Sequence, residues 1–361
     1  MGQGIRRGNS SREVITVTTF IATVFVFGLL VFFHELGHYS VAKLTGVLVY
    51  EFSLGFGPKI YGFKKEETVY NLRAIPLGGF VRMAGMDKND EETEELDDDR
   101  SFNSKTVGQR AAVILAGPIM NFVLAALLLA FVFGFQGVPM ATTVIKELVA
   151  GYPAETSGLM AGDKILAIND SRLDDWESFS AIVSKMPRQE IVVTVERDRA
   201  ERQFAIETMM DAEGTGKIGV MPETGFKREG LLSSLSMGFS WTGKITVMSI
   251  DYITKMFAGR EPVDLGGPVR IVDEIGKAAS VGFFYLLQIA AFLSINLGML
   301  NLLPIPALDG SRVLFLAWEK VYGRPVDPLK ENYIHLAGFA FLIIVMVAVT
   351  YNDIIQLLTP K

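Results

Sequence analysis

The chain has 361 residues, half of them hydrophobic, and a formal net charge of −6. It contains no cysteine, which excludes disulfides, thiolate zinc sites and thiol nucleophiles. The negative charge comes mostly from one acidic run and says little about partners; no nucleic-acid partner is expected.

Four long stretches lack any charged residue: 14–33, 111–135, 278–307 and 336–350. A helix needs about 20 apolar residues to cross the hydrocarbon core of a bilayer, so each stretch can span it or nearly do so. This length disfavours buried helices of a large soluble protein. We predict a polytopic α-helical membrane protein with about four transmembrane helices. They are expected in segments 1–44 (with an N-terminal tail), 108–136, 278–303 and 335–358.

The first stretch follows Arg6, Arg7 and Arg12, as in a cleaved signal peptide. Its uncharged length exceeds the about 7–15 residues usual for a signal sequence, and no cleavage site follows. It passes directly into HELGH, so we predict a retained helix. Lys43, at the end of this helix, is interpreted as a marker of the membrane interface.

The HELGH motif places His34 and His38 one turn apart on the same helix face. Their imidazoles can therefore bind one metal ion, while Glu35 borders that face. Two histidines, a carboxylate and one open position are typical of a catalytic zinc site. In such a site, a glutamate can take the proton of the attacking water. A structural pair of interfacial histidines is the alternative.

Segment 45–107 is predicted to lie on the cytoplasmic side and to contain a membrane-associated β-hairpin and an acidic run. The stretch TVYNLRAIPLGGFVRM (68–83) is interpreted as the hairpin, in which Gly78 and Gly79 permit close backbone approach. Its edge would capture a substrate in extended form; a cap without substrate contact is the alternative. The acidic run 87–99 is expected to be a solvated loop, because it lacks the ligand spacing of an EF-hand calcium site.

Segment 143–210 resembles a PDZ domain. It contains AGYPAETSGLMAGDKILAIND, a helical stretch, and an alternating pair of strands joined at RDRAE. Another small β-rich domain is the alternative. Segment 211–277 is predicted to be a linker with amphipathic helices at the membrane surface or against the spans, notably at 231–258.

A third metal ligand is expected at Asp309, the only acid between Glu274 and Glu319. Prolines in the predicted loop 304–334 interrupt any helix ahead of it, and irregular backbone at membrane depth must be buried in protein or line a cavity. A surface Asp-Gly turn is the alternative. His335 shows no partner pattern and is interpreted as interfacial.

Two asparagines, Asn121 and Asn301, lie in or beside predicted spans. Each is a candidate to hydrogen-bond a substrate strand or the oxyanion that develops during hydrolysis. Packing between helices, where polar side chains join neighbouring spans, is an equally weighted alternative.

The order of these motifs resembles that of the site-2 protease family. The resemblance rests on HELGH, FSLGFGP (52–58), IPLGGFVRMAG (75–85), AGPIMNF (116–122) and NLLPIPALDG (301–310). The single PDZ-like insert is similar to that of bacterial regulators of sigma-E protease type. The resemblance implies intramembrane zinc proteolysis, with His34, His38 and Asp309 as ligands and Glu35 as base.

We therefore expect an intramembrane zinc endopeptidase of the bacterial cytoplasmic membrane. The excess of basic residues in 44–110 and 304–334 favours an active site toward the cytoplasm and an extracytoplasmic PDZ-like domain, although the N-terminal arginines oppose this orientation. Expected substrates are single-span proteins, such as anti-sigma factors after a first cut or remnant signal peptides. By the resemblance, the PDZ-like domain would screen them. The rivals are a non-catalytic membrane scaffold, which would not require Glu35, and a zinc transporter, which would need ligands along a path.

Overall fold

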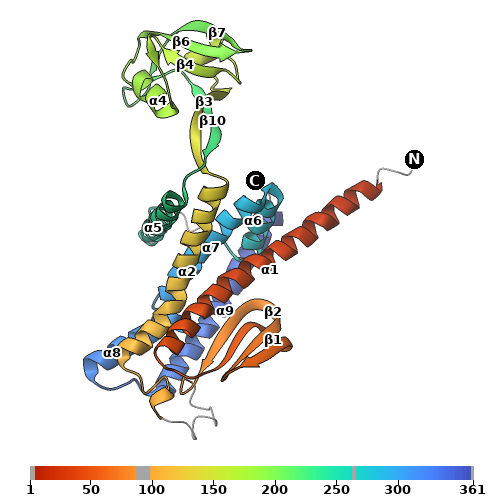
Figure 1. Cartoon of the computed structure of the whole chain (residues 1–361), viewed down its shortest axis with the longest axis vertical. Coiled ribbons are helices and arrows are strands. Elements are labelled where there is room, and N and C mark those ends of the chain that lie inside the picture. The colour runs from red at the N-terminus through yellow and green to blue at the C-terminus, as the bar shows by residue number, and fades with distance from the viewer. Residues whose placement is uncertain (1–4, 87–97, 262–265, 359–361) are drawn as a thin grey trace. The chain divides into compact units, whose positions relative to one another are not determined.

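The computed structural model describes residues 5–86, 98–261 and 266–358 (Figure 1). The chain forms two compact units, one comprising Met1–Phe133 with Gly230–Lys361 and the other Gly134–Glu229. The first unit holds the apolar helices and the HELGH motif; the second holds the PDZ-like insert. Most of the acidic run lies outside the described residues.

Four helices among the described residues are long and apolar enough to cross a membrane. They are α1 (Ile5–Leu44), α2 (Val107–Phe135), α7 (Phe283–Leu302) and α9 (Pro328–Leu358). The predicted fold class is thereby confirmed. The third span begins later than the predicted residue 278, because Gly282, at φ 152°, ends the preceding helix α6 (Pro268–Val281).

The start of α2 shows how the sequence sets a helix end. Thr106 Oγ1 accepts a hydrogen bond from the Gln109 amide at 3.3 Å, while Gln109 Oε1 accepts one from the Thr106 amide at 3.1 Å. This reciprocal capping box satisfies two backbone N–H groups that the helix itself cannot pair. The span therefore begins at a defined residue.

Segment 304–334 is predicted to be a loop, but the structure differs. It contains α8 (Asp309–Tyr322). Leu316 is buried on this amphipathic helix. Gly323, in the left-handed conformation at φ 69°, ends it. Segment 211–277 contains α5 (Leu231–Phe257) as well as α6. Helix α5 packs on α7 and is not among the four candidate spans.

One buried cluster of the first unit is formed by helices α1, α2, α6 and α7. Its fully or almost fully buried side chains are Ala22, Val26, Leu30, Leu124, Ile275, Leu286 and Ala290. In this cluster the helices contact one another through small and branched apolar residues. Such residues let helices pack closely, and in a membrane this packing takes the place of the hydrophobic effect in holding helices together.

Helices α1 and α2 are in tight contact at two glycines. A Cβ on Gly37 would lie 2.2 Å from the carbonyl oxygen of Ala116, and a Cβ on Gly117 would lie 2.2 Å from Nε2 of His38. Any larger residue at either position would push the helices apart. The contact occurs at the HELGH motif itself, so this packing sets the geometry of the site.

A bent two-stranded sheet lies beside the C-terminal half of α1 (Figure 1) and consists of β1 (Val49–Lys65) and β2 (Thr68–Met83). The interpretation of 68–83 as a self-contained hairpin is wrong. Its two halves do not pair with each other; residues 51–54 of β1 lie opposite both 69–72 and 79–82. Strand 49–65, which no sequence pattern indicates, is the partner of both halves.

A polar cluster fixes the register of this sheet. Glu51 Oε1 accepts hydrogen bonds from Ser53 Oγ at 2.5 Å, Asn71 Nδ2 at 2.6 Å and Arg73 Nη2 at 2.6 Å. Burial alone would raise the pKa of Glu51, but these hydrogen bonds and the Arg73 charge hold it below its usual value. The carboxylate therefore stays ionised and ties the strands together.

Tyrosine and phenylalanine side chains dock the sheet on α1. The hydroxyl groups of Tyr39 and Tyr70 are 2.6 Å apart and share a hydrogen bond. The ring of Phe52 packs edge-on against Phe32 and Tyr39. Burial and this hydrogen bond raise the pKa of Tyr70 to about 12, so the hydroxyl keeps its proton at neutral pH.

The second unit has a PDZ-like architecture of a sheet with two short helices. Its strands pair in the order β10-β3-β4-β6-β7, with β5 beside β4, and β8 pairs separately with β9. The strands are β3 (Val138–Leu148), β4 (Lys164–Ile168), β5 (Ser171–Arg172), β6 (Glu190–Arg197), β7 (Ala200–Glu207), β8 (Met209–Met210), β9 (Gly216–Lys217) and β10 (Val220–Lys227). The helices are α3 (Pro153–Thr156) and α4 (Trp176–Ser184).

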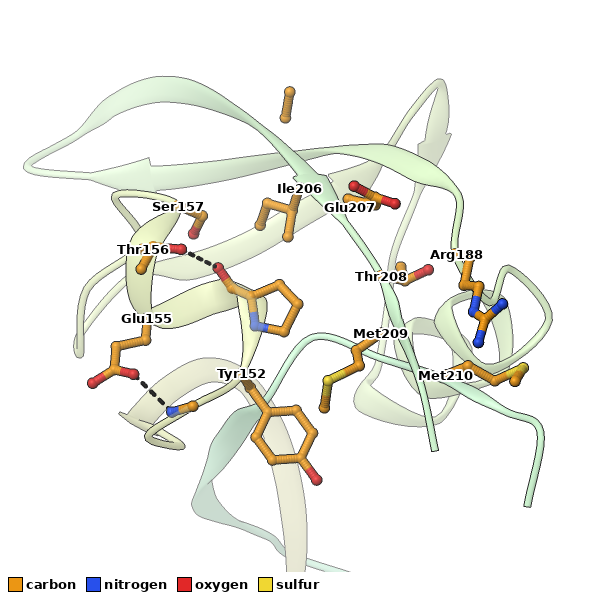
Figure 2. A pocket seen from close by; sticks show the side chains of 13 residues that line it. Tyr152, Glu155, Thr156, Ser157, Arg188, Ile206, Glu207, Thr208, Met209 and Met210 are labelled. Atoms are coloured by element: carbon orange, nitrogen blue, oxygen red, sulfur yellow. Dashed lines mark hydrogen bonds between the residues drawn. The ribbon is translucent and has the colours of Figure 1, made fainter. Parts of the chain in front are cut away.

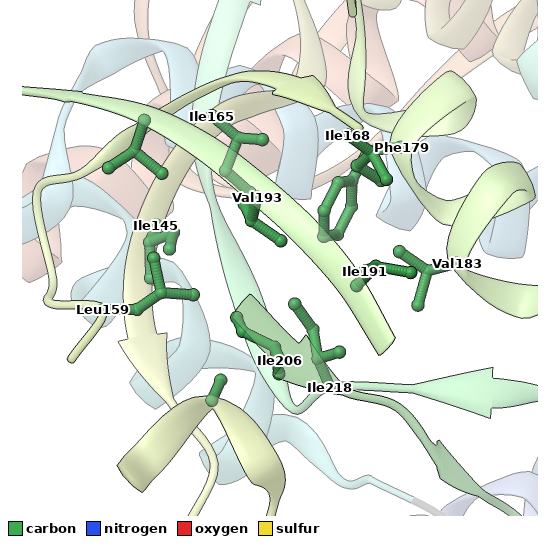
Figure 3. Close-up of a cluster of buried hydrophobic side chains, with 12 residues drawn as sticks. Ile145, Leu159, Ile165, Ile168, Phe179, Val183, Ile191, Val193, Ile206 and Ile218 are labelled. Atoms are coloured by element: carbon green, nitrogen blue, oxygen red, sulfur yellow. The ribbon is translucent and has the colours of Figure 1, made fainter. Parts of the chain in front are cut away.

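Isoleucines and valines of these strands form the core of this unit (Figure 3), where Ile191, Val193 and Ile206 are almost fully buried. The GLMAGD stretch ends at Asp163, which accepts two hydrogen bonds from Arg197 at 2.7 Å and one from the Met160 amide. Burial would raise the pKa of Asp163, but these bonds lower it. The motif thus closes a turn on strand β6.

We predict that the Gly37→Ala substitution destabilises the protein by about 1–3 kcal/mol, because the new methyl group collides with the backbone of α2. Gly28→Ala, on the same helix with no atom within 4 Å of the new Cβ, is the control. It should be neutral or slightly stabilising, since alanine favours a helix over glycine. Thermal unfolding in detergent measures both; equal melting temperatures would contradict the close helix contact.

Candidate active site

Helix α1 presents His34 and His38 toward Asp309 at the start of α8. The two Nε2 atoms are 3.2 Å apart. Asp309 Oδ2 lies 3.2 Å from Nε2 of His34 and 3.4 Å from Nε2 of His38. Three atoms with lone pairs thus converge, from two elements far apart in the sequence.

The triangle of ligand atoms fits zinc. In a tetrahedral site with Zn–N and Zn–O bonds of about 2.0–2.1 Å, neighbouring ligand atoms lie about 3.3–3.4 Å apart. The three observed separations of 3.2–3.4 Å match this value. Asp309 Oδ2 is also buried without a hydrogen-bond donor. Such a cluster of acceptors is unfavourable without a shared cation.

His38 is held in the tautomer that a metal requires. Its Nδ1 lies 2.8 Å from the carbonyl oxygen of Val113 on α2. A carbonyl can only accept, so Nδ1 must donate its hydrogen and Nε2 keeps a free lone pair. This contact could not be predicted from the sequence. Every residue has a backbone carbonyl, and the sequence does not show which one faces His38.

The loop before Asp309 is held by α9. Ala307 has a positive φ of 77°, and its amide donates to Nδ1 of His335 at 3.0 Å. A Cβ on Gly338 would lie 2.3 Å from Pro306, so the loop rests directly on α9. His335 is therefore no metal ligand in this cluster, yet it contacts the segment that presents one. No pattern in the sequence indicates this contact.

Glu35 lies between the metal ligands and the sheet. It is within electrostatic range of His34, His38 and Asp309. A Cβ on Gly79 would lie 2.9 Å from Glu35 Cγ and 3.0 Å from Val31 Cγ1. The absence of a side chain at Gly79 therefore lets strand β2 approach the glutamate.

The remaining predicted residues differ in their placement. Gly78 has φ 133°, and a Cβ there would lie 2.0 Å from the Phe56 ring. Asn121 is fully buried, with its amide 3.2 Å from Nδ1 of His34. Asn301 is half-buried in the last turn of α7. Within the described ranges, no hydrogen bond joins Asn301 to the three ligands.

The PDZ-like domain has a separate pocket (Figure 2). It lies between α3 and the end of β7, with Tyr152, Met209 and Met210 as apolar walls and Arg188 at its rim. Its loop is closed by Glu155, whose carboxylate accepts from the Gly151 amide at 2.7 Å. No group of histidines and acids that could hold a metal occurs here among the described residues.

Comparisons with known proteins identify a family and several relatives. Residues 22–345 match the family model "Peptidase family M50". The chain is 36% identical to a zinc metalloprotease RasP of Geobacillus kaustophilus, and 36% identical to a regulator of sigma-W protease RasP of Bacillus subtilis. Each alignment covers 94% of this chain and 99% of the relative. The PDZ domain of an SdrC-like protein from Listeria innocua matches 23% of this chain and 93% of that structure, with 19% identity and a TM-score of 0.21.

Four helices able to cross a membrane and a histidine–histidine–aspartate group able to hold a metal ion fit a membrane-bound metalloprotease. The chain belongs to peptidase family M50. The predicted resemblance to site-2 proteases, the protease activity and the zinc cofactor are confirmed.

We predict that Asp309→Ala weakens zinc binding by more than about 100-fold, beyond the 10–100-fold effect of residues that only support a ligand. Asp327→Ala is the control, because Asp327 is exposed and its carboxylate accepts a hydrogen bond from the Leu329 amide, away from the histidines. Zinc content after dialysis against graded chelator concentrations measures the loss. Equal retention of zinc by the two variants would show that Asp309 is not a ligand.

Proposed function

We propose that this protein hydrolyses peptide bonds within the transmembrane segments of single-span membrane proteins. The central observation is that a zinc-sized ligand triangle is built from the HELGH motif of a candidate span. Ionisable side chains within a span are costly and are usually functional. A zinc site at this position would bring hydrolysis to bonds that soluble proteases do not reach.

In this proposal His34, His38 and Asp309 hold the ion. When bound, zinc supplies Lewis acidity, which activates a water molecule and polarises the substrate carbonyl. Glu35 accepts the proton of the attacking water and passes it to the leaving amine nitrogen. The carbon–nitrogen bond breaks as the amine takes that proton.

Strand β2 is the proposed substrate platform. A substrate helix cannot be cut while its carbonyl groups remain in helical hydrogen bonds, so the substrate must be held extended. Residues 79–81 pair with residues 52–54 of β1 and with no other strand of the described sheet, so a substrate strand could be added along their other edge. Gly79 places that edge beside Glu35.

The proposed substrates are single-span proteins that another protease has already shortened, such as anti-sigma factors, and remnant signal peptides. The name of the Bacillus subtilis relative links that protein to sigma-W regulation, which supports the first class. The PDZ-like domain would screen substrates, and its pocket combines apolar walls with the exposed Arg188. We propose a bacterial cytoplasmic membrane location, with the active site toward the cytoplasm and the PDZ-like domain outside.

Transport and scaffolding fit the structure less well. A transporter needs ligands distributed along a path, whereas the metal-ligand group found in the described residues converges at one point. A scaffold needs neither the triangle nor the adjacent Glu35. The geometry therefore favours hydrolysis.

We predict that Glu35→Gln abolishes cleavage but preserves zinc binding, because Glu35 serves as base and not as ligand. Membrane proteomes of cells expressing either form should show short single-span stubs that accumulate only with the variant. Glu223→Gln, which changes an exposed glutamate on strand β10 of the other unit, is the control. Turnover of the same stubs by a zinc-loaded Glu35→Gln protein would refute the catalytic role.

We also predict that substrates bind along residues 79–82. The chain has no cysteine, so single cysteines can be introduced cleanly. In the Glu35→Gln background, Phe80→Cys should form disulfide cross-links with cysteines near the substrate cleavage site. Tyr61→Cys, on the opposite edge of the sheet and 64% exposed, should form none. Cross-linking at Tyr61→Cys alone would place the substrate on the other edge.

A further inference from the structure

Asn121 occupies an unusual position for a polar side chain. It is 0% exposed on α2, and its backbone carbonyl accepts a hydrogen bond from Ser294 Oγ of α7 at 2.8 Å. Its side-chain amide lies 3.2 Å from Nδ1 of His34. Asn121 of α2 thus contacts both α7 and α1. It faces Nδ1 of His34, the ring nitrogen that points away from the proposed metal position.

The identity of the amide atom that faces His34 decides the chemistry. If Nδ2 faces the ring, it donates to Nδ1, and a neutral imidazole must then carry its hydrogen on Nε2. That nitrogen has no lone pair left for zinc. In this orientation Asn121 Oδ1 is also buried without any donor, which costs about 1–3 kcal/mol.

Turning the amide by half a rotation removes the conflict with zinc binding at His34. The two ends of an asparagine amide are almost isosteric, so their assignment follows from hydrogen bonding. Oδ1 then accepts from Nδ1–H of His34, and Nε2 directs its lone pair toward Asp309 and His38. His34 thereby gains the same support that the Val113 carbonyl gives His38.

We propose that Asn121 is a positioning residue that acts as a hydrogen-bond acceptor and sets the tautomer and ring orientation of His34. This inference rests on the zinc site and not on the identity of the substrate. It also replaces our expectation that Asn121 binds the substrate or its oxyanion, because that role would need an N–H donor reaching the substrate from a fully buried side chain.

A donor and an acceptor role predict opposite results for one substitution. Asn121→Asp keeps the size and the acceptor but removes the N–H group. A carboxylate behind a zinc-bound histidine is a common arrangement, so this variant should bind zinc within about threefold of the wild type. Asn121→Leu keeps the volume without an acceptor and should weaken zinc binding about 10–100-fold.

Zinc affinity, measured by competition with a chromophoric chelator, is the first readout and is independent of proteolysis. Ser294→Ala is the control, because it loosens the backbone contact of Asn121 without changing the amide. It should bind zinc like the wild type. Equally weak binding by the Asp and Leu variants, or wild-type binding by both, would overturn the proposal.

The second readout needs no variant at the site. The chain has three histidines, so ¹⁵N labelling of histidine side chains gives a spectrum simple enough to assign, with His335→Gln identifying one set of signals. In the zinc-loaded wild-type protein, Nδ1 of both HELGH histidines should carry a hydrogen. An unprotonated Nδ1 on His34 would overturn the proposal even if every variant failed to fold.

Discussion

The site depends on the close contact between α1 and α2. Because Gly37 and Gly117 have no side chains, the HELGH turn of α1 lies directly on the α2 backbone. The space that a methyl group at position 117 would fill is taken by the metal-binding edge of His38. The same contact brings the Val113 carbonyl and Asn121 to the outer nitrogens of the two histidines. One packing interaction therefore positions both ligands and their supports.

The third residue of the triangle, Asp309, must be positioned separately, because it lies 271 residues after His38 in the chain. Prolines 304 and 306 and the positive φ of Ala307 turn the chain after α7, and His335 and Gly338 hold that turn against α9. Helix α8 is then tied back to α2 by Arg110, whose Nη2 lies 2.6 Å from Glu319 Oε1 in a largely buried pair. Helix α2 therefore positions both the histidines and the aspartate, although it donates no ligand itself.

Structure could be predicted from the sequence where a single physical requirement determines residues that are close together in the chain. Apolar runs reveal spans because the bilayer requires length, and the spacing of His34 and His38 reveals a metal face because a helix repeats every 3.6 residues. Prediction failed where the partner is distant or is backbone. The strand 49–65 was missed because its bends at Gly55 and Gly57, both with positive φ, break the alternating pattern. Asn121 was predicted as a site residue, but the pattern did not reveal which atom it would face.

Helix α1 also determines where the sheet lies. The Tyr39–Tyr70 hydrogen bond and the packing of Phe52 attach the sheet one turn beyond Glu35 on the same helix. At its other end, the sheet reaches Glu35 through Gly79, where even a methyl group would also strike the carbonyl oxygen of Ser53 at 2.8 Å. His34, His38, Glu35 and the strand edge are thus all positioned by one helix. In the proposed reaction, a substrate strand that pairs with β2 is held at a fixed position relative to Glu35. The sheet, and not the bilayer, therefore sets which bond is cut. A substrate needs only enough local unwinding to pair with β2, and its side-chain sequence matters chiefly through how readily it leaves the helix.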